Sequence, residues 1–164
     1  MIQRKVCILG SFAVGKTSLT TRFTESIFSD QYHTTIGVRI HKRQITVDSQ
    51  PVSLVVWDLA GEDELVRLRT AYLRGASGYI LVADATRSET LEVTMRLQAR
   101  AEEAIGPVPF ILVINKLDLV DEAIAGRLRQ ELSSLNWERY WTSARTGSGV
   151  EEAFLALVHK MRKC

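Results

Sequence analysis

Residues 10–17 read GSFAVGKT and match the pattern G-x-x-x-x-G-K-[ST] of a phosphate-binding loop. Residues 4–9 before this loop are typical of a short buried strand, and residues 18–23 after it are typical of the start of a helix. In such an arrangement the loop N–H groups and the helix N-terminus attract the same anion. An ordinary strand–turn–helix, whose glycines only make the turn, is the weaker alternative. The loop therefore predicts an α/β fold with a phosphate site.

Four residues of this loop have specific expected roles. Gly10 and Gly15 allow backbone angles and close approaches that a Cβ would block. Lys16 is expected to reach the terminal phosphates as a point charge, and Thr17 to place its hydroxyl on Mg²⁺. The predicted site thus holds a phosphate chain together with a magnesium ion.

Length and composition exclude several classes of protein. The chain has 164 residues, which suits one domain over residues 1–164. No apolar run is long enough to cross a bilayer. A net charge of +2 is too small to indicate nucleic-acid binding. The two cysteines, Cys7 and Cys164, are far apart, and we expect a reduced, cytoplasmic protein.

Predicted strands alternate with predicted helices along the chain. The strands are expected at residues 4–9, 38–47, 51–57, 78–83, 110–114 and 140–141. The helices are expected at residues 16–25, 88–104, 121–135 and 148–163, with Ser88 a candidate cap, residues 26–35 a loop and residues 62–74 a further helical candidate. This alternation predicts an α/β fold with a parallel sheet and helices on both of its faces.

Two further motifs follow predicted strands, where ligand crevices form in such folds. Asp58-x-x-Gly61 could hold Mg²⁺ through water and bring the Gly61 N–H close to a γ-phosphate. Asn115-Lys116-Leu117-Asp118 is more specific, because one carboxylate can accept from both N1–H and N2–H₂ of guanine. Adenine lacks that donor pair, so Asp118 would select guanine.

The other base contacts complete this prediction. Asn115 would supply an amide near N7 of the base, and the Lys116 stem would cover the face of the ring. Ser143-Ala144-Arg145 follows the last predicted strand and could present the Ala144 N–H to guanine O6. Taken alone, this tripeptide carries no information.

Together these motifs resemble the five signatures of Ras-superfamily small GTPases, in the order and spacing of that family. The segments 35–38, 57–58 and 72–76 are most similar to the Rab branch. The resemblance implies the P-loop NTPase fold in three layers, with a mostly parallel six-stranded sheet and one antiparallel edge strand. It also implies a switch that binds GTP or GDP with Mg²⁺ and slowly hydrolyses GTP.

By this resemblance, Thr35 would bind Mg²⁺ and the γ-phosphate, Phe28 would pack on the base and Tyr32 would cover the phosphates. The remaining nucleotide contacts would come from Ala13, Val14, Ser18 and Arg145. The residues implied in hydrolysis are Lys16, Thr35, Gly61 and Glu62, and those implied at the metal are Thr17, Thr35 and, through water, Asp58.

The resemblance also implies protein partners. Effectors and regulators would read two switch loops, near residues 27–38 and 59–74. Three side chains, Ile40, Trp57 and Tyr72, match the apolar positions that Rab-like proteins present to partners. Ile40 departs from the aromatic residue usual there. We expect a monomer that binds no nucleic acid.

Three features depart from the family pattern. Glu62 stands where a Gln is usual, and Phe12 fills a position that is usually small. The last residues carry neither paired cysteines nor a C-a-a-X box, so no stable membrane anchor is expected in this chain. The first two departures keep open the alternative of a GTP-binding scaffold with negligible hydrolysis. A P-loop kinase is a third hypothesis, against which the Asn115–Asp118 motif argues.

Overall fold

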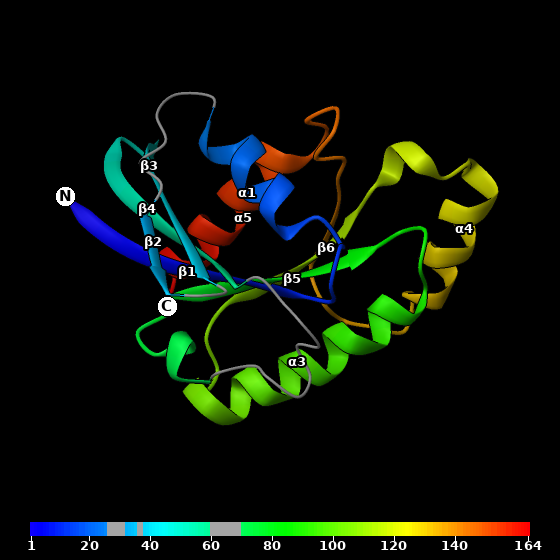
Figure 1. The fold of residues 1–164 in the computed structure, drawn as a ribbon, viewed down its shortest axis with the longest axis horizontal. Coiled ribbons are helices and arrows are strands. Elements are labelled where there is room, and N and C mark those ends of the chain that lie inside the picture. Colours follow the sequence, from blue (N-terminus) through cyan, green and yellow to red (C-terminus); the bar gives the residue numbers. More distant parts are fainter. Residues whose placement is uncertain (26–31, 36–37, 60–69) are drawn as a thin grey trace.

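The computed structural model describes residues 1–25, 32–35, 38–59 and 70–164 (Figure 1), and for residues 32–35 only the backbone. In the described part of the chain one sheet has the order β2-β3-β4-β1-β5-β6-β7. Its pairs are parallel from β4 to β7, and antiparallel between β2, β3 and β4. The strand bounds are β1 Ile2–Gly10, β2 Tyr32–Thr35, β3 Val38–Val47, β4 Gln50–Leu59, β5 Gly78–Asp84, β6 Phe110–Asn115 and β7 Arg139–Trp141.

Helices cover both faces of this sheet. The described helices are α1 Lys16–Thr24, α3 Glu89–Ile105, α4 Glu122–Glu131 and α5 Val150–Arg162, with short 3₁₀ turns at Thr70–Leu73 and Leu117–Leu119. Figure 1 shows α1 and α5 on one face of the sheet and α3 on the opposite face. Within the described ranges, no helix is long and apolar enough to cross a membrane.

The predicted mixed sheet is confirmed: all six predicted strands lie in it, and β3 is antiparallel to β4, as the hairpin predicted. Asp48 and Ser49 make its turn with positive φ angles of 47° and 62°. The short strand β2 extends the sheet beyond β3, in a segment that the sequence predicted as loop. Its four residues are polar and show no apolar alternation, so the sequence pattern gave no signal for this strand.

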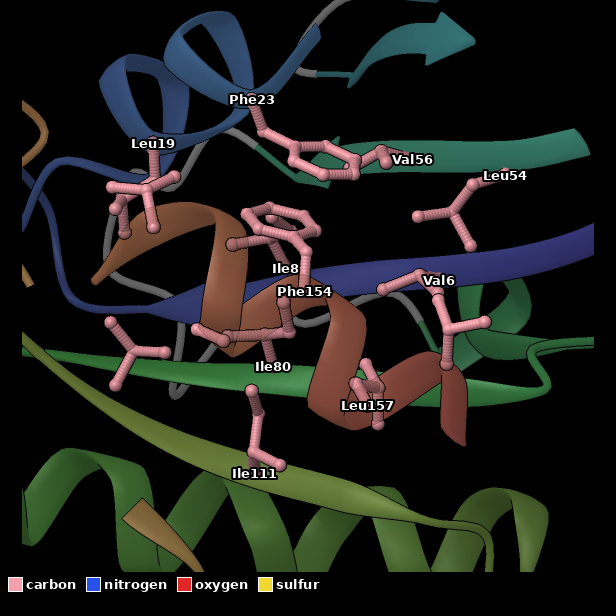
Figure 2. Close-up of a cluster of buried hydrophobic side chains, with 14 of the residues drawn as sticks. Val6, Ile8, Leu19, Phe23, Leu54, Val56, Ile80, Ile111, Phe154 and Leu157 are labelled. Atoms are coloured by element: carbon pink, nitrogen blue, oxygen red, sulfur yellow. The ribbon is translucent and has the colours of Figure 1, made fainter. Parts of the chain in front are cut away.

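Two cores pack against the sheet, one on each face. Under α1 and α5, the rings of Phe23 and Phe154 stack with centroids 4.0 Å apart (Figure 2). Beneath them lie inward-facing side chains of the central strands, among them Val6, Ile8 and Ile80. The opposite core joins α3 and α4 to the other side of the same strands. Burial on both faces explains why the central strands are continuously apolar.

Two helix ends differ from the sequence prediction. Ser88 precedes α3, but its side chain makes no cap hydrogen bond. Instead the Thr90 hydroxyl donates to the Arg87 carbonyl at 2.6 Å, inside the same turn. The fourth helix is shorter than the predicted 121–135: Asp121 caps it by accepting from the Ile124 N–H at 2.9 Å, and it ends at Glu131.

Candidate functional site

The carboxyl ends of five neighbouring strands, β4, β1, β5, β6 and β7, meet at one edge of the sheet, and the predicted motifs follow them. The phosphate loop joins β1 to α1 there. A Cβ on Gly10 would lie 2.5 Å from the Val82 carbonyl oxygen of the neighbouring strand. Gly15 has a φ of 101°, and a Cβ on it would meet the Asn115 side-chain amide. Both positions therefore require glycine, as the sequence predicted.

Lys16 opens α1 and is buried within the loop. Its ammonium group donates to the carbonyls of Gly10, at 2.6 Å, and Ser11, at 3.0 Å. A cation is thus held by neutral carbonyls on the inner side of a phosphate loop. A bound phosphate would be a charged acceptor for this ammonium group, and charge-assisted hydrogen bonds are the stronger ones.

Two other carbonyls of the loop, those of Ala13 and Val14, accept hydrogen bonds from side chains of the Asn115–Asp118 motif. Asn115 Nδ2 donates to the Val14 carbonyl at 3.0 Å. Lys116, which has a φ of 67°, donates from Nζ to the Ala13 carbonyl at 2.7 Å. The fold therefore connects the phosphate loop directly to the motif predicted to bind the base.

The base-side cluster, defined as Asn115, Asp118, Ser143 and Ala144, is a connected network. Ser143 Oγ donates to Asp118 Oδ1 at 2.7 Å. Asn115 Oδ1 accepts from the Ala144 N–H at 3.1 Å and from the Thr142 hydroxyl at 3.0 Å. The two loops after β6 and β7 are thus brought together, as the motifs predicted.

Two donors of this cluster have partners that the sequence did not indicate. The Asn115 amide, expected near guanine N7, donates to the phosphate loop, and the Ala144 N–H, expected at guanine O6, donates to Asn115. In this geometry both atoms hold the loops in place. The predicted base contacts of these two atoms remain predictions.

Arg22 of α1 supports the same loop from its other side. Its Nε donates to the Ala144 carbonyl at 2.9 Å, and its guanidinium also bonds the Arg145 carbonyl. The sequence gives no sign of this role for Arg22, because an arginine on an amphipathic helix does not indicate a partner 122 residues away.

The Thr17–Asp58 pair lies on the other side of the phosphate loop. The Thr17 hydroxyl donates to Asp58 Oδ2 at 2.5 Å. Asp58 is fully buried, and its Oδ1 has no hydrogen-bond partner among the described residues. A buried carboxylate oxygen of this kind is destabilising unless it is paired or coordinates a cation. Hydroxyl and carboxylate oxygens suit Mg²⁺, so the pair fits the predicted ion.

Several predicted residues can be placed only in part. Ser18 is exposed on α1, and the backbones of Tyr32 and Thr35 belong to β2. Phe28, Gly61 and Glu62 lie outside the described residues. Their predicted roles are therefore untested by the geometry.

The predicted partner residues lie on the β3–β4 side of the sheet. Ile40 and Trp57 are register partners across these strands, and Trp57 packs against Tyr72 with ring centroids 6.3 Å apart. Lys5 Nζ lies 3.7 Å from the Trp57 ring centroid and also donates to the Arg74 carbonyl at 2.7 Å. Ile40 is buried, whereas Trp57 is half-buried.

Comparison with known proteins gives one consistent result. The family model described as Ras family matches residues 5–163. Ras-related protein Rab-1C of Dictyostelium discoideum is 33% identical over 165 residues, which cover 97% of this chain and 81% of that protein. The GTP-binding protein yptV2 of Volvox carteri is 36% identical over 157 residues, 93% of this chain and 72% of that protein. Ras-related protein Rab-8B of Homo sapiens is 33% identical over 156 residues, 93% of this chain and 75% of that protein.

Proposed function

The chain belongs to the Ras family and is a GTP-binding small GTPase switch that hydrolyses GTP, and we propose that the cradle formed by the phosphate loop, the base-side cluster and the Thr17–Asp58 pair binds its guanine nucleotide. The GTP-binding scaffold with negligible hydrolysis is not favoured by this membership. Effectors and regulators of this family act on its nucleotide-dependent states.

One observation carries the proposed site: Asn115 and Lys116 donate to successive carbonyls of the phosphate loop. The same segment carries Asp118, so a base bound at Asp118 and phosphates bound in the loop would lie in one continuous site. The Lys116 stem runs along this path and suits contact with the face of a planar base. In the proposal Ala13, Val14, Gly15, Lys16, Thr17 and Ser18 bind the phosphates.

Asp118 selects guanine in this proposal. Its Oδ1 accepts from Ser143, which fixes the carboxylate plane while leaving lone pairs for the base, since an ionised carboxylate has about four acceptor positions. Phe28 packs on the base, Arg145 lies beside it, and Tyr32 and Thr35 close over the phosphates. These residues are proposed from the family pattern of the sequence.

Thr17, Asp58 and Thr35 are the proposed holders of Mg²⁺. Held by these residues, Asp58 through water, Mg²⁺ would supply positive charge against the negative charge that develops on the phosphates. The Thr17 hydroxyl of α1 donates to the Asp58 carboxylate of β4, whose Oδ1 has no hydrogen-bond partner among the described residues. Lys16 binds the terminal phosphates, and Gly61 and Glu62 act beside the γ-phosphate.

A single-turnover experiment tests the hydrolysis assigned to this cradle. Purified protein is loaded with GTP, Mg²⁺ is added, and the GDP formed is measured over time. We expect GDP to form slowly in the native chain and more slowly still in Lys16→Ala. Tight GTP binding without any GDP formation would instead make the protein a scaffold.

We assign partner binding to the surface of Ile40, Trp57 and Tyr72. Its support is the packing of Lys5, Trp57 and Tyr72, which holds an aromatic face on β4, the strand that also carries Asp58. The test is capture of the partner by the GTP-loaded and the GDP-loaded protein. Partner binding that is unchanged in folded Trp57→Ala would contradict this surface.

Three further statements about the whole chain belong to the same proposal. We place the switch in one domain over residues 1–164, acting as a monomer. We place it in the cytoplasm, and the support is that Cys7 and Cys164 are both free thiols. Size-exclusion chromatography with light scattering tests the monomer, and a stable dimer would contradict it.

A further inference from the structure

Asp84, the last residue of β5, lies at the centre of a charged cluster that the function above does not use. Its side chain is almost fully buried. Oδ1 accepts from the Thr86 N–H at 2.8 Å and from the Thr86 hydroxyl at 2.6 Å. Oδ2 accepts from Lys116 Nζ at 2.8 Å and from Arg87 Nε at 3.0 Å. Every hydrogen bond favours the carboxylate.

The protonation state of Asp84 follows from this geometry. Burial alone would raise the pKa of the Asp84 carboxyl group. The hydrogen bonds from Lys116, Thr86 and Arg87 outweigh burial and lower the pKa to about 2. Asp84 is therefore ionised at neutral pH and binds two cations at once.

Each of the two cations also holds a carbonyl of the phosphate loop. Lys116 donates to the Ala13 carbonyl at 2.7 Å. Arg87 donates from its terminal nitrogen to the Phe12 carbonyl at 2.8 Å. The Arg87 fork thus spans from Asp84 to Phe12, with a separate N–H for each partner. Asp84 supports two successive peptide groups of the loop through these side chains.

The direction of these carbonyls fixes the direction of the N–H groups. In a planar trans peptide the C=O of one residue and the N–H of the next point in opposite directions. Arg87 on the Phe12 carbonyl therefore turns the Ala13 N–H to the other side of the chain. In the same way Lys116 directs the Val14 N–H, and Asn115 directs the Gly15 N–H. Three successive N–H groups are held by three side chains.

Ala13 has a backbone that needs such support. Its φ is 60°, in the left-handed region that a residue with a Cβ enters at a cost of about 1 kcal/mol. Residues in this conformation persist where the surroundings fix them. Here the carbonyls on both sides of Ala13 are fixed, one by Arg87 and the other by Lys116.

We propose that Asp84 and Arg87 are positioning residues that aim the Ala13 N–H at the terminal phosphates of the nucleotide. The proposal rests on the nucleotide site proposed above. The three supports run from Val14, held by the base-side residue Asn115, through Ala13 to Phe12, held by Arg87. The peptide that Arg87 holds is thus the one furthest from the base. The hydrogen bond from Arg87 to this peptide therefore affects the contacts of the terminal phosphates and leaves the guanine contacts unchanged.

The test compares Arg87→Ala with Arg96→Ala, an exposed arginine of α3 whose one ion pair among the described residues is a 4.0 Å contact with Glu92. Two quantities are measured for the native protein and both variants: the dissociation rate of GDP, and the phosphorus NMR spectrum of bound GDP. We expect GDP to leave Arg87→Ala on the order of fivefold faster, as loss of one hydrogen bond predicts. The β-phosphorus resonance should move, and the α-phosphorus resonance should stay near its native position.

Arg87→Lys is a second variant that distinguishes loss of loop positioning from a general effect on folding. It keeps a positive charge beside Asp84 but has one amino group in place of two separated donors, so we expect the same β-phosphorus shift at smaller size. A GDP dissociation rate and β-phosphorus resonance that match those of Arg96→Ala in both Arg87 variants would overturn the proposal. Failure of the native protein to bind GDP would overturn the nucleotide site itself, which separates the two results.

Discussion

The two sides of the phosphate loop differ in how completely their polar side-chain atoms are hydrogen-bonded. On the base side, the Asn115 side chain makes three hydrogen bonds to other described residues, and Asp118 is held by Ser143. On the metal side, Asp58 accepts from Thr17 but buries a second oxygen that has no partner among the described residues. A buried oxygen of this kind destabilises the protein by about 1–3 kcal/mol or more.

The two sides therefore differ in how much of their hydrogen bonding the described residues supply themselves. The base side holds its loops in place through its own hydrogen bonds, so little order has to be gained there on binding. At the metal side, the described residues leave one buried carboxylate oxygen of Asp58 without a hydrogen-bond partner, and a cation would supply one. We therefore expect guanine affinity to depend on the side chains of the base side. On the metal side, we expect nucleotide binding to depend on whether the ion is present.

The largest effect is expected from Asp118→Asn on the base side. The amide replaces one of two acceptors by a donor, which then faces the N2–H₂ group of guanine, whereas O2 of xanthine could accept from it. We expect GTP affinity to fall on the order of 100-fold, since two charge-assisted hydrogen bonds are disturbed. Xanthosine triphosphate affinity should rise. Equilibrium titration of both nucleotides measures this, and unchanged GTP affinity would show that Asp118 does not contact the base.

On the metal side, the matching change is Asp58→Asn, with Glu92→Gln as a control at an exposed carboxylate. Chelating Mg²⁺ from the native protein should speed GDP release by about tenfold or more, because the ion links protein and phosphates. In Asp58→Asn the release rate should be nearly the same with and without the chelator. If the variant kept the native response to chelation, Asp58 would not hold the ion.

Much of this contrast could be predicted from the sequence, because its parts are local motifs. The loop glycines, the strand–loop–helix order and the Asn115–Asp118 motif each lie within a few residues. Contacts between distant residues gave no such signal. Arg87 and Phe12 are 75 residues apart, and the carbonyl that Arg87 binds has no side-chain signature at all.

The missed strand β2 and the shortened helix α4 have different causes. Residues 32–35 form a strand because their backbone pairs with β3, although their polar side chains predict loop. α4 ends at Glu131, before two serines and an asparagine, residue types that compete with helix through their side chains. The first error misses a whole short strand and the second misplaces a helix end, and neither moves a residue of the cradle.

Glu62→Gln tests whether a side chain beyond the cradle limits the chemistry on the metal side. Gln can accept from the attacking water and donate toward a phosphate oxygen, while an ionised Glu only accepts and repels the phosphate. We expect single-turnover GTP hydrolysis on the order of tenfold faster in the variant. A native rate that falls when Gln is introduced would show that Glu62 acts productively, for example as a base on the water.

The smallest effect is expected from Ser143→Ala, which removes the support of Asp118 but leaves its carboxylate. One hydrogen bond to a charged group is lost, and a water can replace part of it, so GTP affinity should fall about fivefold. The control is Ser133→Ala, at an exposed serine whose hydroxyl donates to the Gln130 carbonyl and has no other partner in the described ranges. Equal affinities in the two variants would mean that Asp118 needs no positioning by Ser143.

The binding constants of GDP, GTP and ATP for the native chain, each with and without Mg²⁺, test the central assignment most directly. We expect GDP and GTP to bind far more tightly than ATP, because Asp118 accepts from a donor pair that adenine lacks. We also expect Mg²⁺ to tighten GDP and GTP binding. Equal affinity for ATP and GTP, or guanine nucleotides that bind equally well without the ion, would contradict it.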